Sequence, residues 1–271
     1  ELALTNPQNR VQQEMIEGPL LGYKRAVEEV KALAELVRGL PTDLPALALL
    51  DGSLVLWGLV GGGHGEYVRR ALLVEGLLPA LDALREEGQK RPLAVASYIS
   101  LPRATEAVNT LRIALCPYDV PDCDRHCRAV PPLERNCDGV ARVLDRHIFE
   151  HTLEPGQRSA LFTSHSSIVD DYYGPHQILF FYLHTGTEVA RVELPRWVQE
   201  EGQLDLLHAL LNEQVRLGHG YPLSLAEAHE QAVISGPDRA RFKEMIDASL
   251  TSHQLPVYTS EKSRAKRLRW V

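Results

Sequence analysis

The sequence predicts an α/β protein in which a mixed sheet is flanked by helices. Segments with helical spacing of apolar residues alternate with short apolar runs, and at least two of these runs are joined by tight turns. Hairpins are antiparallel, so they exclude an all-parallel doubly wound sheet. No internal repeat or low-complexity linker interrupts the chain, and we therefore expect one domain over residues 1–271.

The first half of the chain supplies a long helix, a hairpin and then alternating helices and strands. Residues 7–39 carry apolar side chains at helical spacing, and Gly39 and Pro41 end the helix. The turn Asp51-Gly52-Ser53 separates two apolar runs and predicts a hairpin. The expected elements are strands at 46–50 and 54–60, a helix at 66–87, a strand at 92–100 and a helix at 103–114.

The second half is predicted to contain a hairpin between helices. A turn at 184–187 joins two apolar runs, which predicts antiparallel pairing. The expected elements are a helix at 138–150, strands at 161–168, 178–184 and 188–194, and helices at 203–217 and 224–249.

The composition is that of a globular protein with an acidic balance. Hydrophobic residues make up 44% of the 271 residues, and the formal net charge is −7. These values exclude a disordered chain, a collagen-like repeat and a coiled coil. A protein that coats nucleic acid by charge alone is normally basic, whereas metal-binding carboxylates would make a nuclease acidic. The chain has no apolar run of about 18 residues and no visible secretory signal, so we expect a cytosolic protein.

One segment, the tail 250–271, is locally strongly basic. Its last part carries Lys262, Arg264, Lys266, Arg267 and Arg269. Such a run is either a solvated tail or a surface that binds phosphates or a partner. If it binds, removal of residues 262–271 weakens DNA or partner binding more than folding.

Four cysteines lie in one proline-rich segment, 116–137. They are Cys116, Cys123, Cys127 and Cys137, spaced C-x6-C-x3-C-x9-C. Buried structural cysteines scatter through a core, and two disulfides would suit a secreted protein, so we favour a metal site with four thiolate ligands. No C-x2-C knuckle of a zinc site is present, which favours an iron–sulfur cluster. His126 as a substitute ligand would favour zinc.

Three carboxylates are candidates for a cation site. Asp51 ends an apolar strand, where a carboxylate is costly unless it is paired or metal-bound; capping of its own turn is the alternative. Glu106 stands at a strand-to-helix junction, where favourable interaction with the helix dipole is the simpler explanation. Asp145 lies among apolar helical positions, which makes it a candidate cation ligand; an ion pair with Arg142 or Arg146 is the alternative explanation. Hard oxygen ligands suit Mg2+ or Mn2+.

The chain resembles the NurA family of nucleases, partners of the HerA hexameric translocase. The matching stretches lie within residues 45–245 and follow one another in the same order as in the family. No single motif is highly specific, but the set of motifs in this order is. The matching stretches are Ala48-Leu-Leu-Asp51-Gly-Ser53, Ser97-Tyr-Ile-Ser100 with Glu106, Leu144-Asp-Arg146 with Leu153-Glu-Pro-Gly-Gln-Arg-Ser159, Phe180-Phe-Tyr-Leu183 with Ala190-Arg-Val-Glu-Leu-Pro195, and Gly220-Tyr-Pro-Leu223 with Ala228-His229.

The resemblance implies a ribonuclease-H-like sheet and a metal-dependent deoxyribonuclease. Asp51, Glu106, Asp145 and His229 would hold Mn2+ or Mg2+, with Tyr182 beside them. Some relatives have Asn where this chain has Glu227, which puts the role of that position in doubt. Two cations roughly 4 Å apart would activate water and stabilise the leaving oxygen. The cysteine segment lies outside the family pattern and reads as an insertion.

The resemblance further implies a homodimer that degrades single-stranded DNA and resects 5′ ends with a HerA-like hexameric ATPase for recombination repair. Aromatic side chains that stack on bases would be candidates for strand tracking: Trp57, Tyr67, Tyr98 and Tyr172. Two alternatives stay open: a ribonuclease-H-like nuclease without a translocase, and a metal-stapled scaffold subunit without enzyme activity.

Overall fold

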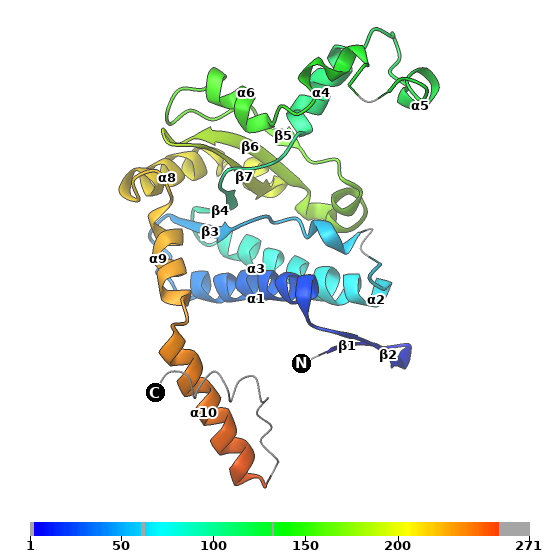
Figure 1. Ribbon diagram of the computed structural model, residues 1–271. Helices are drawn as coiled ribbons and strands as arrows, with labels where there is room; N and C mark the ends of the chain where they lie inside the picture. Colours follow the sequence, from blue (N-terminus) through cyan, green and yellow to red (C-terminus); the bar gives the residue numbers. More distant parts are fainter. Residues whose placement is uncertain (1–2, 61–62, 132, 255–271) are drawn as a thin grey trace, which may run out of the picture. The chain divides into compact units, whose positions relative to one another are not determined.

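The computed structural model describes residues 3–60, 63–131 and 133–254 (Figure 1). The chain divides into two compact units, Glu1–Ala226 and Glu227–Val271. Whether they act as the single predicted domain stays a prediction. The basic positions from Lys262 to Arg269 lie outside the described residues.

The first unit contains a mixed sheet of five strands. Their order is β3-β4-β7-β6-β5, with β3 parallel to β4 and the other neighbouring pairs antiparallel. This confirms the predicted mixed α/β class; the ribonuclease-H-like topology stays a prediction. The strands are β3 (Ala46–Asp51), β4 (Leu93–Ile99), β5 (Phe162–Thr163), β6 (Ile178–His184) and β7 (Val189–Pro195). A separate hairpin pairs β1 (Ala3–Asn6) with β2 (Asn9–Met15).

The central strands are apolar because both of their faces are covered. All seven residues of β7 are buried, and so are the first six of β4 and of β6. Side chains alternate between the two faces of a strand. Arg191 and Glu193 are therefore on one face of β7, and Val192 is on the other.

Helices in the first unit cover this sheet (Figure 1). The long helix α1 packs on α3 and β3, while α6 contacts β6 and β7. The helical elements of the first unit are α1 (Gly18–Arg38), η1 (Trp57–Leu59), α2 (Glu66–Arg69), η2 (Arg70–Leu77), α3 (Leu78–Gly88), α4 (Glu106–Ala114), α5 (Cys123–His126), η3 (Asn136–Val140), α6 (Asp145–Thr152), η4 (Val169–Tyr173), η5 (Gly174–His176), α7 (Arg196–Glu200) and α8 (Leu204–Leu217). Helix α9 (Leu223–Ala232) begins in the first unit and ends in the second, which also holds α10 (Gly236–Ser252).

The predicted hairpin at 46–60 is wrong. Strand β3 pairs in parallel with β4 instead, and residues 54–60 are not a strand. Gly52 has φ +94°, which breaks the strand. Beyond it, the amide of Leu54 donates to the Glu193 carboxylate and the amide of Leu56 donates to the Tyr173 hydroxyl. Side chains thus take the hydrogen bonds that a neighbouring strand would have taken.

Other boundaries also differ from the prediction, among them that of the helix expected at 138–150, which is divided into η3 and α6. The expected helix over 7–39 begins only at Gly18, because residues 9–15 form β2 and Pro19 occupies the first turn of α1. The expected strand over 161–168 is reduced to Phe162–Thr163. The expected helix over 224–249 is divided at Ser235-Gly236-Pro237, where Ser235 caps α10. Within the described ranges, no helix is long and apolar enough to cross a membrane.

Candidate active site

A cleft of about 970 Å³ lies beside the start of α4 and the middle of β7. Its polar lining comes from separate elements: Ser53 and Trp57 follow β3, Glu106 begins α4, and Arg191 and Glu193 lie on β7. Clefts that join polar groups from several elements are the usual place for a binding or catalytic site.

Glu193 is fully buried and ties the segment after β3 to the sheet. Its carboxylate accepts hydrogen bonds from the Ser53 hydroxyl at 2.8 Å and from the Leu54 amide at 2.9 Å. The other carboxylate oxygen accepts from Nε of Arg191 at 2.9 Å. A buried carboxylate is stable only when it is paired and hydrogen-bonded in this way.

Arg191 connects Glu193 to Glu106 across the cleft. Its Nη1 contacts the Glu106 carboxylate, and its guanidinium lies 3.6 Å from the centre of the Phe180 ring. Burial alone would lower the pKa of Arg191, but the carboxylates of Glu193 and Glu106 outweigh burial and raise it. The buried Nη2 has no hydrogen-bond partner among the described residues. Arg191 lines the cleft, and one of its guanidinium donors is buried without a described partner.

Asp145 lies at the start of α6 and stabilises the start of α4. Its carboxylate accepts from the amides of Ala107 at 3.1 Å and Val108 at 2.8 Å, and from the Tyr182 hydroxyl at 2.6 Å. Thr105, at the N-cap of α4, makes no side-chain cap. Asp145 thus satisfies two amides that a helix leaves without partners, and all three donors converge on its buried carboxylate.

Tyr182 lies between Asp145 and Arg191. Its hydroxyl bonds Asp145 and is 3.5 Å from Nη1 of Arg191. Burial, together with this hydrogen bond to Asp145, raises the pKa of Tyr182. The predicted residues Glu106, Asp145 and Tyr182 are therefore joined through Arg191 and the first turn of α4.

Asp51 lies on the other face of the sheet. It is in register with Tyr98, which opposes Val192 rather than the flanking Arg191 or Glu193. The Tyr221 hydroxyl donates to Asp51 at 3.4 Å, and the rings of Tyr98 and Tyr221 meet edge to face. Burial, followed by the nearby Asp51 carboxylate, raises the pKa of Tyr221 to about 12.

The predicted carboxylates do not form a single cation site in this arrangement. The strand register assigns Asp51 to the face of the sheet opposite Arg191 and Glu193, and the Asp145 oxygens already accept three hydrogen bonds. Over the described part of the chain, no three His, Cys, Asp or Glu side chains are grouped so as to hold a metal ion. Their oxygen chemistry suits Mg2+ or Mn2+, but their geometry does not fit one shared ion.

His229 and Glu227 belong to the second unit and are both exposed. The role of His229 as a cation ligand stays a prediction, and the role of Glu227 stays open. Of the aromatic candidates, Trp57 lines the cleft with 43% of its surface exposed, whereas Tyr98 is buried and its hydroxyl donates to Glu188.

Sequence reasoning included Arg191 and Glu193 in a stretch that matches the family but gave them no role in the site. The signal available was two opposite charges spaced i, i+2 in the apolar strand Val189–Pro195, because that spacing puts both on one buried face. Tyr221 carried no comparable local signal, because its contact with Asp51 joins residues that are distant in the sequence.

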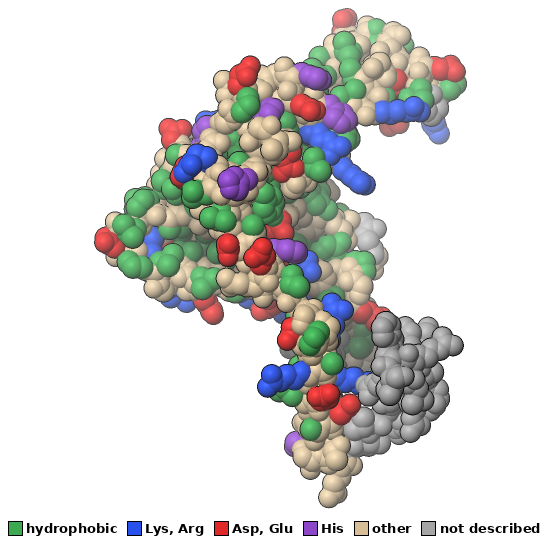
Figure 2. Space-filling view, turned by 60° about the vertical axis from the view of Figure 1, so that its left-hand side comes forward, with side chains coloured by type: hydrophobic (Ala, Val, Ile, Leu, Met, Phe, Trp, Pro, Cys, Tyr) green, Lys and Arg blue, Asp and Glu red, His purple; other side chains and the backbone are tan. Residues whose placement is uncertain are grey.

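Surface charge is mixed on the face drawn in Figure 2. There, Lys and Arg side chains are interspersed with acidic ones and do not form a continuous basic surface. This agrees with the formal charge of −7.

Comparisons with known proteins give one family. A family model described as the NurA domain matches residues 8–234. Among solved structures, the chain is similar to the NurA nuclease from Sulfolobus solfataricus, with 14% sequence identity and a TM-score of 0.44. The similarity covers 92% of this chain and 73% of that chain. No curated protein matches this chain.

Proposed function

The chain belongs to the NurA family, and from this premise we propose that it is a deoxyribonuclease that hydrolyses phosphodiester bonds with the aid of a divalent cation. The family match over residues 8–234 carries the proposal. It is supported by the cleft, where the ion pair of Arg191 and Glu106 lies beside the exposed indole of Trp57.

Arg191 is suited to bind a phosphodiester oxygen. Its planar guanidinium is fixed by Glu193 and Phe180, while the Nη2 donor has no described partner. A preorganised donor of this kind stabilises negative charge that develops on phosphate. Glu106 shares the guanidinium and is partly exposed to the cleft.

The divalent cation, Mn2+ or Mg2+, enters this proposal on the family resemblance. When bound to carboxylates, it would supply Lewis-acid stabilisation of the phosphate. The proposal keeps Asp51, Glu106, Asp145 and His229 as the candidate ligands. The described carboxylates do not meet at one point where an ion could bind. The requirement for a cation is therefore tested separately from nuclease activity.

The decisive experiment measures cleavage of end-labelled single- and double-stranded linear DNA by the purified chain. We expect cleavage with Mn2+ or Mg2+ and none with EDTA, and loss of cleavage in Asp51→Ala and Glu106→Gln. Asp43→Ala is the matched control, since Asp43 is an exposed carboxylate before the same strand. Absence of cleavage under every condition would refute the nuclease, whereas cleavage that persists in EDTA would refute only the cation.

We also propose a homodimer that works with a HerA-like hexameric ATPase in DNA end resection and recombination repair. This part rests on the resemblance, and twofold dimers are the commonest oligomers. Analytical ultracentrifugation tests the dimer, and co-purification with a hexameric ATPase tests the partner. A monomer at micromolar concentration, or no association with the ATPase, would contradict the respective part.

A further inference from the structure

The cysteine segment between α4 and α6 has almost no core of its own. From Asn109 to Leu144 none of the described residues is buried. Large apolar side chains are exposed instead, including Ile113 at 61% and Val120 at 75%. Segments that bury so little apolar surface need another constraint, such as disulfides or a metal.

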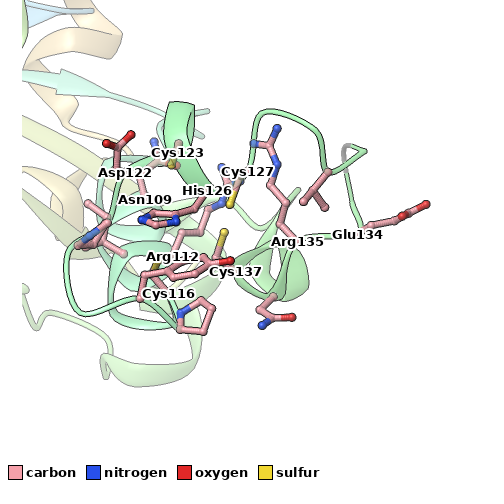
Figure 3. Close-up of a pocket in the computed structure, with 16 residues that line it drawn as sticks. Asn109, Arg112, Cys116, Asp122, Cys123, His126, Cys127, Glu134, Arg135 and Cys137 are labelled. Atoms are coloured by element: carbon pink, nitrogen blue, oxygen red, sulfur yellow. The ribbon is translucent and has the colours of Figure 1, made fainter.

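The four thiols line one cavity in this segment. Cys116, Cys123, Cys127 and Cys137 are among the residues that line a space of about 370 Å³, and all four are free cysteines. In Figure 3 they approach this space from different turns of the segment, and the side chains of Cys127 and Cys137 point toward each other.

Positive charge also lines the cavity. Arg135 is one of the residues that line it, and its buried Nε has no hydrogen-bond partner among the described residues. Arg112 also lines the cavity and is paired with Asp138 at 2.6 Å. An unpaired buried guanidinium donor beside four thiols fits a site that becomes negative when occupied.

We propose that Cys116, Cys123, Cys127 and Cys137 bind an iron–sulfur cluster. Four thiolates are the ligand set of such clusters. A single zinc ion needs its ligands around one point, whereas no three ligand-type side chains among the described residues meet that condition. A cluster spaces its ligands more widely, because its own iron and sulfide atoms occupy the centre. His126, the alternative zinc ligand, is stacked on Tyr118 with ring centroids 4.0 Å apart.

The cluster would fix the two helices that carry candidate site residues. Cys116 follows α4, which begins at Glu106, and Cys137 lies in η3, shortly before α6 and Asp145. The Arg112–Asp138 ion pair already joins α4 to η3. As a positioning element, the cluster would hold Glu106 and Asp145 in place; this role rests on the proposed nuclease function, whereas cluster binding does not.

The test is anaerobic purification of the full chain, with reconstitution by iron and sulfide, followed by metal and acid-labile sulfide analysis. We expect iron and sulfide in equal amounts and a visible absorption that bleaches with dithionite. Each Cys→Ser variant should lose most of the iron. Asp124→Ser, an exposed position between two of the cysteines, should retain it, and so should His126→Ala. Zinc as the sole metal, no bound metal, or unchanged iron in the Cys→Ser variants would overturn the proposal.

Two further variants separate cluster binding from nuclease activity. Asp51→Ala should keep the iron and the visible spectrum while it loses DNA cleavage. Cys127→Ser should lose iron, and limited proteolysis should then cut residues 116–143 faster than in the parent chain. If the chain binds the cluster but cleaves no DNA, the proposal of cluster binding stands and the proposed nuclease function is refuted. If the rate of proteolysis does not change after the iron is lost, the positioning role is refuted.

Discussion

Replacement of Asp145 by alanine should destabilise the fold, whatever its part in catalysis. The buried carboxylate accepts three hydrogen bonds, two from the first turn of α4 and one from Tyr182. A hydrogen bond to a charged group contributes about 1.5–3 kcal/mol, and the two helix amides would regain part of this from water. We therefore expect Asp145→Ala to lower the free energy of unfolding by about 3–5 kcal/mol.

Urea denaturation followed by far-UV circular dichroism measures this loss. Asp145→Asn preserves the volume and one acceptor oxygen, so it should cost about 1–3 kcal/mol. The exposed-site control Asp43→Ala should stay within about 0.5 kcal/mol of the parent chain. If Asp145→Ala lowers the free energy of unfolding by less than about 1 kcal/mol, Asp145 does not cap the first turn of α4. If Asp145→Asn remains folded but loses cleavage, the carboxylate also has a role in the reaction.

Two other predictions address the cleft and the dependence of stability on pH. Trp57→Ala should weaken binding of single-stranded DNA by about 1–3 kcal/mol in fluorescence anisotropy, because an exposed indole stacks on bases; unchanged affinity would remove Trp57 from the interface. His176 is buried and accepts from the Trp197 indole at 3.1 Å, and burial lowers its pKa despite the opposing effect of Asp82. The unfolded chain therefore takes up protons first, and the free energy of unfolding should fall as the pH drops below about 6.5. Urea titrations at several pH values should show this slope in the parent chain and a smaller slope in His176→Gln; equal slopes would contradict it.

The sequence was sufficient for elements whose signal is local. The run 178–184, the turn after it and the run 188–194 predict an antiparallel pair, and β6 and β7 form it. The segment after Asp51 was predicted wrongly because its partners are distant: Glu193 and Tyr173 take the amide hydrogen bonds of Leu54 and Leu56. Periodicity cannot distinguish an apolar strand from an apolar loop that side chains satisfy.

The same limit applies to the candidate site. Glu106 and Asp145 lie near each other because a helix start needs an acceptor, and Asp145 supplies it from another helix. Their proximity therefore has a structural cause that does not require a cation. Arg191 is a separate support for the proposal at this cleft, since Glu193 holds its guanidinium and its buried Nη2 lacks a described partner.

Asp51 tests whether the reaction extends beyond this cleft. By strand register it lies on the opposite face, and it contacts Tyr221, so Asp51 and Glu106 would hold the same cation only if the segment after Gly52 or the start of α4 moved. If Asp51→Ala and Glu106→Gln both abolish cleavage but only Glu106→Gln weakens phosphate binding, the two carboxylates serve different steps. If both variants lose cation binding equally, the active arrangement brings them together, and the Arg191–Glu106 ion pair must open to allow it.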